Sequence, residues 1–181
     1  MSAIEILVDE HRLISRTVNV LRVLNKRLER GDPVDVNVLM EVVDFFRMFV
    51  DKNHHTKEEW GLFPVLERCK VNPEGCTIQS LKSEHEQARI LTTTLADQLG
   101  KHKTSDSKVM ICATLRNSIE LHNDHIWREN ILLFPAAEKA FQESESNAVT
   151  ASYSEVEERL GAGFRAKYEQ VVNALENNGG N

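Results

Sequence analysis

Two pairs of residues in the sequence have the types and the spacing of ligands for a pair of metal ions. His54 and Glu58 are four residues apart, and so are His125 and Glu129. Residues four apart on a helix share one face, so each pair would direct an imidazole and a carboxylate to the same point. A carboxylate has two oxygens and can bridge the cations of a two-metal site. We therefore expect Glu58 and Glu129 to bridge two metal ions.

Two further histidines, His11 and His85, complete the predicted ligand set. We expect His11 and His54 to bind one metal ion, and His85 and His125 to bind the other. Four neutral imidazoles with two carboxylates make a site too rich in nitrogen for Mg²⁺ or Ca²⁺, and it lacks the thiolates that favour copper(I) or a cluster. Iron fits this set, with manganese and zinc as alternatives.

Another two histidines lie beside these motifs. His55 lies about 100° around the helix from His54, and His122 precedes His125 by about one helical turn. Each is either an additional ligand or a hydrogen-bond partner of a ligand. We include His55 among the candidate ligands and keep His122 as the alternative.

Three glutamates stand directly beside candidate ligands: Glu10, Glu59 and Glu84. We expect their side chains to face the solvent; the alternative for Glu10 and Glu84 is a hydrogen bond to a ligand. Ionised glutamates that are buried cost several kcal/mol each unless they are paired or bind a metal. The interpretation that competes with a metal site is therefore a buried hydrogen-bond network.

The motifs belong to an internal repeat, which indicates how they are positioned. LVDEHRLI at 7–14 resembles LKSEHEQA at 81–88, and HHTKEEWGLFPVLE at 54–67 resembles HIWRENILLFPAAE at 125–138. Each half is then a helix pair, with Glu-His on its first helix and HxxxE followed by Phe-Pro on its second. Two such hairpins would pack as a four-helix bundle with the histidines and glutamates in one core.

Hydrophobic periodicity predicts helices over residues 2–30, 36 to about 60, about 77–101, and about 106–142. Ser2 with Glu5 is a capping-box pattern, Asp35 can cap the second helix, and Gly31 is a stop signal. Pro64 is expected to kink or end the second helix, and a short helical piece is expected to follow it to about Cys69. The predicted fold class is all-α: an up-down four-helix bundle with an additional C-terminal helix.

The predicted domain organisation separates the bundle, at residues 1–142, from a C-terminal part at 143–181. The polar run ESESNAVTA predicts a linker, a helix should follow to about 176, and NNGG near the end predicts a disordered tail. Two roles stay open for the C-terminal helix: to cover the bundle, or to mediate a homodimer.

Composition excludes several classes of function. The net charge of −6 and the lack of a basic stripe argue against a nucleic-acid partner. No apolar run approaches the roughly 20 residues needed to span a membrane, and the N-terminus lacks the pattern of a signal peptide. The chain has three cysteines, an odd number without a CxxC motif, which favours a reducing cytoplasm as its location.

Over about residues 5–140 these motifs resemble the hemerythrin-like HHE cation-binding family. The resemblance rests on the two Glu-His helices and the two HxxxE copies that end in Leu-Phe-Pro. It implies a four-helix bundle that holds two iron ions, bridged by carboxylates and usually by an oxo or hydroxo group. The residues that match the family's metal ligands, with His55 matching an extra ligand of some relatives, are His11, His54, His55, Glu58, His85, His125 and Glu129.

The resemblance implies a function that involves O₂, H₂O₂ or NO. Members of the family bind or sense oxygen, react with peroxide or nitric oxide, handle iron, or repair iron–sulfur centres. Arg89 stands where oxygen carriers have a further histidine, and Glu129 stands one position before their last aspartate. These departures favour a reactive or sensing centre over reversible oxygen carriage. A redox protein is a further candidate partner of the chain. The alternative is an iron-responsive or iron-handling module without turnover.

Overall fold

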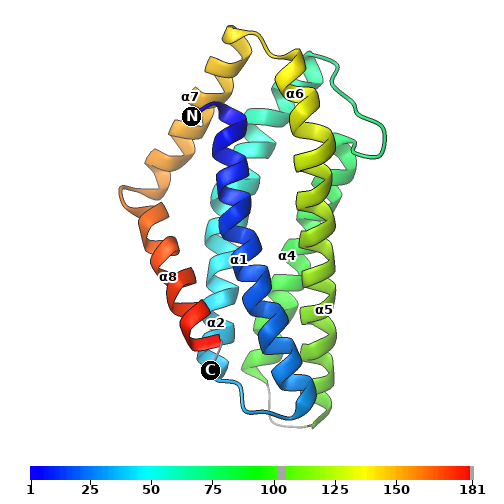
Figure 1. Cartoon of the computed structure of the whole chain (residues 1–181), viewed down its shortest axis with the longest axis vertical. Helices are drawn as coiled ribbons and strands as arrows, with labels where there is room; N and C mark the ends of the chain where they lie inside the picture. Colours follow the sequence, from blue (N-terminus) through cyan, green and yellow to red (C-terminus); the bar gives the residue numbers. More distant parts are fainter. Residues whose placement is uncertain (102–104, 180–181) are drawn as a thin grey trace.

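The computed structural model describes residues 1–101 and 105–179, and within these ranges the chain is helical and has no β-strand. Four helical stretches run up and down beside one another (Figure 1), so the predicted four-helix bundle is confirmed. The elements of the bundle in chain order are α1 (Ala3–Arg30), α2 (Val36–Phe45), η1 (Phe46–His55), η2 (Lys57–Leu62), α3 (Phe63–Arg68), α4 (Ile78–Gly100), α5 (Ser105–Arg128), η3 (Glu129–Leu133) and α6 (Phe134–Ala140).

The ends of the first helices follow the predicted signals. The Ser2 hydroxyl accepts a hydrogen bond from the backbone N–H of Glu5, and the Glu5 carboxylate accepts one from the Ser2 N–H. Gly31 ends α1 with a φ of +91°, a left-handed conformation that glycine adopts without strain. Asp35 caps α2 by accepting from the N–H of Asn37.

The second stretch passes from η2 into the short helix α3 next to Pro64 and continues to Arg68, close to the predicted end of the helical piece at about Cys69. The residues before the proline form a π-helical turn, in which the N–H of Phe63 donates to the carbonyl of Glu58, five residues back. This shift of the hydrogen-bond register places Pro64 in the first turn of α3, where a missing N–H is tolerated.

The other half of the repeat has the same arrangement. The N–H of Phe134 donates to the carbonyl of Glu129, and Pro135 lies in the first turn of α6. The carbonyls of both glutamates thus accept the hydrogen bond of a π-helical turn. The equivalence of the two halves therefore extends to the backbone of this turn, whereas the π-helix η1 has no counterpart in α5.

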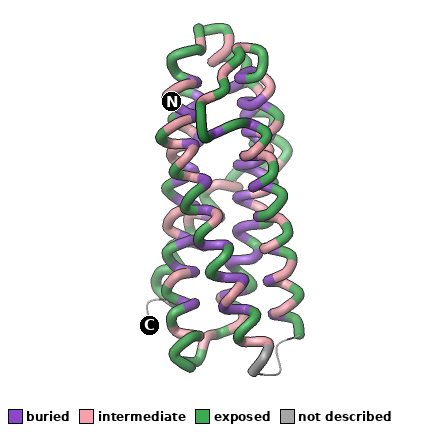
Figure 2. Tube along the Cα trace, turned by 90° about the vertical axis from the view of Figure 1, so that its right-hand side faces the viewer, coloured by how far each residue is buried: buried purple, intermediate pink, exposed green. Residues whose placement is uncertain are grey.

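Apolar side chains fill the bundle in two clusters, one towards each end. One cluster includes Leu21, Phe49 and Leu115, and the other includes Leu7, Leu66 and Leu81. Along α1 the buried His11 lies between Leu7 of one cluster and Leu13 of the other. Buried positions run along the inside of the helices (Figure 2). A polar layer thus separates the two apolar clusters.

The C-terminal part is helical from its start, so the prediction of a polar linker is wrong. Helix α7 (Glu143–Leu160) begins inside the run ESESNAVTA, because Gln142 and Glu145 form a capping box and Val149 is buried against the bundle. Polar residues in that run form the outer face of an amphipathic helix.

The predicted additional helix is present as two helices, because α7 is followed by a second helix, α8 (Phe164–Gly179). The helical conformation is interrupted between α7 and α8 at Gly161 and Gly163, both of which have positive φ. Both helices lie along one side of the bundle (Figure 1). Tyr168 and Val172 of α8 join the apolar cluster that α1 and α2 contribute to.

The predicted disordered tail is helical as far as Gly179, and positions 180 and 181 lie outside the described residues. In the described ranges, none of the helices combines the length and the apolar character needed to cross a membrane.

Candidate metal centre

All seven candidate ligands lie buried in the polar layer at the middle of the bundle. Each is at most 4% exposed. The four helical stretches all contribute, and the residues are His11 on α1, His54 and His55 on η1, Glu58 on η2, His85 on α4, His125 on α5 and Glu129 on η3. Their potential ligand atoms form overlapping groups within 4.8 Å of one another.

One half of the centre is formed by His11 and His54. Their Nε2 atoms lie 3.0 Å apart. Glu129 Oε2 lies 3.1 Å from His11 Nε2, and Glu58 Oε1 lies 3.6 Å from His54 Nε2. An imidazole pair and one oxygen from each carboxylate therefore surround a single point.

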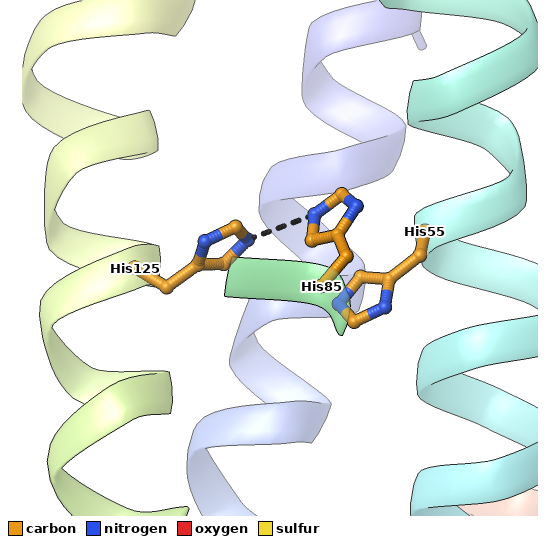
Figure 3. A group of neighbouring side chains, drawn as sticks. All are labelled: His55, His85 and His125. Carbon is orange, nitrogen blue, oxygen red and sulfur yellow. Dashed lines mark hydrogen bonds between the residues drawn. The ribbon is translucent and has the colours of Figure 1, made fainter. Parts of the chain in front are cut away.

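The other half has the same arrangement around His85 and His125. Their Nε2 atoms lie 3.2 Å apart, and the dashed line in Figure 3 joins the two rings. Glu58 Oε2 lies 3.3 Å from His85 Nε2, and Glu129 Oε2 lies 3.3 Å from His125 Nε2. Glu58 thus turns one oxygen to each half, as a bridging carboxylate would.

The Nδ1 atom of each of these four histidines donates a hydrogen bond away from the centre. His54 donates to Glu10 at 2.9 Å, and His125 donates to Glu84 at 2.8 Å. Because these carboxylates only accept, the proton stays on Nδ1 and the Nε2 lone pair faces the centre. This is the tautomer that a metal-binding imidazole requires.

The other two histidines donate to residues that directly follow Glu58 and Glu129 in the sequence. His85 Nδ1 donates to Glu59 at 2.7 Å, and His11 Nδ1 donates to Asn130 at 2.9 Å. Glu59 and Asn130 are equivalent residues of the repeat, since each directly follows a candidate bridging glutamate. The amide in place of one carboxylate makes the two halves differ in charge.

The expectation that Glu10, Glu59 and Glu84 face the solvent is therefore wrong. Glu10 and Glu84 are buried, and the Glu59 side chain is only 23% exposed. The repeat already indicated that Glu10 and Glu84 have a role at the centre, because the Glu-His dipeptide occurs in both halves. In each half the histidine faces the centre while the preceding glutamate holds the histidine of the neighbouring helix. Asn130 was missed altogether, although its place after Glu129 marks it as the partner of Glu59.

The candidate ligand atoms of the centre lack the hydrogen-bond partners that buried polar atoms need. None of the four carboxylate oxygens of Glu58 and Glu129 has a hydrogen-bond partner among the described residues. In each half two Nε2 lone pairs also face each other at close range. Buried polar groups of this kind are costly unless satisfied. Cations at the two points would satisfy the inward-facing Nε2 atoms, both oxygens of Glu58 and Oε2 of Glu129, so the residues fit a pair of metal ions.

The protonation states of the centre follow from its burial. Burial lowers the pKa of His54 to about 4 and lowers that of His55 well below its usual value. Burial and the neighbouring carboxylate of Glu129 raise the pKa of Glu58 well above its usual range. Burial acts to raise the pKa of Glu129 too, but the adjacent imidazoles of His125 and His11 bring it below its usual value. The centre therefore resists holding two negative carboxylates without added positive charge.

His55 lies closer to the centre than the alternative, His122. The His55 ring stacks on that of His85, with a centroid distance of 3.7 Å and an interplanar angle of 12° (Figure 3). It forms a potential ligand group with His85 and His125, whereas His122 enters none of the groups found among the described residues. Geometry therefore favours His55 as the additional ligand.

The C-terminal part contributes side chains that sequence reasoning did not connect with the centre. Lys57 is 1% exposed, and its Nζ lies 2.6 Å from Glu10 and 2.6 Å from Glu157 of α7. Tyr153 of α7 packs against Gly61, and its buried hydroxyl has no partner within the described ranges. Helix α7 is thus linked through Lys57 and Glu10 to the imidazole of His54.

Comparison with known proteins gives two findings. Residues 2–137 match the hemerythrin HHE cation binding domain. Proteins named Uncharacterized protein Rv1995, from Mycobacterium tuberculosis, and Uncharacterized protein Mb2018, from Mycobacterium bovis, are each 23% identical over 176 residues, which cover 95% of this chain and 68% of the relative. The matched family segment contains all seven candidate ligands and ends before α7.

Proposed function

Because the chain belongs to the hemerythrin HHE cation-binding domain family, we propose that it is a non-haem di-iron protein. Its substrate or ligand is a small oxidant, O₂, H₂O₂ or NO, which it binds, senses or reduces. The observation that carries this proposal is the set of candidate ligand atoms at the centre that have no hydrogen-bond partner. Four carboxylate oxygens lack partners among the described residues, and four imidazoles turn their Nε2 lone pairs inward.

The proposed ligand assignment follows the two halves of the repeat. His11 and His54 would hold one iron, and His85 and His125 would hold the other, together with His55. Glu58 and Glu129, which lie between the two histidine pairs, would supply carboxylate ligands to both. Imidazole and carboxylate ligands suit iron, and manganese or zinc are the competing metals.

When bound, the iron pair would supply a change between ferrous and ferric states and a coordination position for the oxidant. The chain itself orients the imidazoles through their Nδ1 hydrogen bonds and excludes water. Phe134 stacks on His11 with centroids 5.3 Å apart, and Phe63 stacks on His85 with centroids 5.8 Å apart. These rings form apolar walls, which raise the strength of electrostatic interactions inside the site.

An iron-responsive regulatory module without turnover is a second candidate. It is favoured by the contact of α7 with Lys57, which is adjacent to the proposed bridging residue Glu58. Binding of metal at Glu58 could then alter the position of α7, which lies outside the matched family segment. Turnover of an oxidant separates the two candidates, because the regulatory module would bind iron without consuming peroxide or oxygen.

Elemental analysis of the untagged protein, supplied with iron and purified without chelator, tests the proposal. We expect close to two irons per chain, and a loss of at least one in Glu58→Gln and in Glu129→Gln. Glu120→Gln, a change at an exposed glutamate on α5, should retain both. A folded protein with little iron would contradict the di-iron proposal, and stoichiometric zinc or manganese would replace iron as the metal. Absorption changes with O₂, H₂O₂ and NO would then identify the oxidant.

A further inference from the structure

A cation stands directly before each candidate bridging glutamate, and it has the same partner in both halves of the repeat. The two cations are Lys57 and Arg128. Lys57 Nζ lies 2.6 Å from Oε1 of Glu10, and a guanidinium nitrogen of Arg128 lies 2.6 Å from Oε1 of Glu84. Equivalent cations thus bind equivalent glutamates, each across to the neighbouring helix.

Each cation begins a chain of contacts that ends on a candidate metal ligand. Glu10 accepts from Lys57 through Oε1 and from His54 Nδ1 through Oε2. The equivalent chain of the other half consists of Arg128, Glu84 and His125. A carboxylate that is held at one oxygen keeps its other oxygen against the imidazole, so the cation fixes the acceptor that orients the ring.

The two chains differ at their outer ends. The Arg128 side chain is 25% exposed. Lys57 is only 1% exposed, and its Nζ lies 2.6 Å from a second carboxylate, that of Glu157 on α7. Tyr153 precedes Glu157 by one turn on the same face of α7, and its ring centroid lies 5.8 Å from the same Nζ. The chain that ends on His54 therefore continues into α7.

Helix α7 lies over the half of the centre that this chain serves. It packs against α1, η1 and η2 along one side of the bundle (Figure 1). Asn53 of η1 also donates to Glu10 Oε1, at 2.9 Å, whereas the equivalent residue of the other half is Asp124, whose carboxylate has no N–H to donate. The acceptor of His54 is thus held by buried contacts beneath α7.

We propose, on the basis of the metal centre proposed above, that Lys57 and Arg128 are matched positioning residues, one for each metal position, and that α7 controls the position of His11 and His54 alone. An ammonium group is strongly hydrated, so Lys57 stays on Glu10 as long as α7 and Glu157 keep water away from it. When α7 is displaced, Lys57 turns to the solvent and releases Glu10. His54 then loses its fixed acceptor, and the metal in that half leaves faster.

Release of Co²⁺ from the cobalt-loaded protein to excess EDTA, followed by the absorption of the bound ion, tests this assignment. Glu157→Gln should speed the release of half of the cobalt about threefold, a modest effect because the Glu157 side chain is 58% exposed. Lys57→Met should speed the release of the same half about tenfold, as loss of a group that orients a metal-binding imidazole does. Arg128→Met should speed the release of the other half.

Double variants show whether two changes act on the same half. Lys57→Met with Glu157→Gln should leave half of the cobalt as slow as in the wild type. Arg128→Met with Glu157→Gln should leave none of it slow. Arg128→Lys, which keeps a cation for Glu84, should recover most of the wild-type rate, as a purely structural role of the side chain would not predict.

The matched control is Glu158→Gln, which makes the same change of charge at the neighbouring exposed residue of α7. It should release cobalt as the wild type does. An unaltered release in Glu157→Gln and Lys57→Met would overturn the proposal. So would an equal acceleration of all the cobalt in either variant, because α7 would then support the bundle as a whole.

A measurement on the metal-free protein separates this proposal from the di-iron proposal. In ¹⁵N-labelled protein the Nδ1 proton of His54 should exchange slowly with water, since its acceptor Glu10 is only 2% exposed. Glu157→Gln should speed this exchange about threefold and leave that of the His125 Nδ1 proton unchanged. His54→Gln identifies the resonance.

The two outcomes of this measurement are distinct. If the protein contains no iron but the exchange responds in this way, α7 holds His54 through Lys57 and only the di-iron proposal falls. If Glu157→Gln leaves the exchange of the His54 proton unaltered, α7 does not act on this half, and the present proposal is wrong whatever the metal content.

Discussion

At the scale of single residues, the centre depends on acceptors that hold the imidazoles as much as on the imidazoles themselves. Glu10 and Glu84 fix the tautomer and the ring orientation of His54 and His125. Partners of this kind raise the basicity of the ligand and save the cost of ordering it when metal binds. Each glutamate comes from the neighbouring helix, so it also sets how the two helices pack.

Glu84→Ala should weaken metal binding about 10- to 100-fold, the usual effect of removing such a partner. His125 would lose its acceptor and could adopt the tautomer that turns a proton towards the metal. Competition with a coloured chelator measures the change in affinity. Glu120→Ala removes an exposed carboxylate from α5 and should bind metal as the wild type does. Equal affinities in the two variants would show that Glu84 does not position the ligand.

The metal-free protein should lose stability as the pH falls from about 6.5 to about 4. The pKa of His54 and that of His122 are each lowered to about 4 by burial, so the unfolded chain binds more protons in this window. The stabilisation is complete above pH 6.5 and is lost towards pH 4, by up to about 3 kcal/mol per histidine.

Urea unfolding at several pH values measures this dependence. His122→Phe has one buried histidine fewer and should show a shallower loss between pH 6.5 and pH 4. A stability that is constant over this range, or that rises as the pH falls, would contradict buried neutral imidazoles at these positions.

At the scale of elements, the π-helical turns set the position of the two proposed bridging residues. In η2 the carbonyl of Glu58 accepts from the N–H of Phe63, in η3 the carbonyl of Glu129 accepts from the N–H of Phe134, and a proline follows each phenylalanine. A π-helical turn inside a helix rotates the residues on either side relative to each other, and such turns are frequent at functional sites. The Phe-Pro pairs therefore allow the helices to continue past the centre into the apolar cluster beyond it.

Gly61 in η2 lies in close contact with α7. A Cβ atom added at Gly61 would lie 2.9 Å from Cε1 of Tyr153 and 3.2 Å from Cβ of Ser152. Gly61→Ala should therefore cost about 1–3 kcal/mol of folding free energy, although alanine favours helices. Urea unfolding and limited proteolysis of α7 measure the effect.

The control for Gly61→Ala is Gly100→Ala at the end of α4, where an added Cβ meets no atom within 4 Å. That variant should be as stable as the wild type or slightly more so. The double variant Gly61→Ala with Tyr153→Ala should lose less than the sum of the two single changes, because the clash is relieved. Additive losses would mean that α7 does not pack as described.

At the scale of the whole molecule, the polar centre lies between two apolar clusters that can each form without metal. Helices α7 and α8 add to both clusters, through Tyr153 at one end and Tyr168 at the other. The chain should therefore fold as a bundle without metal, with the centre as its least stable layer. This distinguishes the protein from small domains that are unfolded until they bind metal.

Removal of metal by a chelator should lower the free energy of unfolding by about 4 kcal/mol when the free metal had been about 1,000 times its dissociation constant. Thermal unfolding measures the loss, and hydrogen exchange should increase mainly in η1, η2 and η3. His54→Ala should remove most of this metal-dependent stabilisation. A metal-free protein as stable as the loaded one, together with a harmless His54→Ala, would instead indicate a purely structural bundle.

The sequence alone determined the helices of the bundle and the residues that meet at its centre. Both follow from local information. The spacing of His54 and Glu58 places them on one helix face, and the repeat indicates that two equivalent hairpins pack together. Capping by Ser2 and the stop at Gly31 are local signals as well.

Tertiary structure alone decided what surrounds the centre. Whether Glu10 faces solvent or His54 depends on how α1 packs against η1, and no spacing within one helix contains that information. The run ESESNAVTA looks like a linker until Val149 has an apolar surface to cover. The chain of contacts from α7 through Lys57 to Glu10 depends equally on packing, because its members come from elements that are distant in sequence.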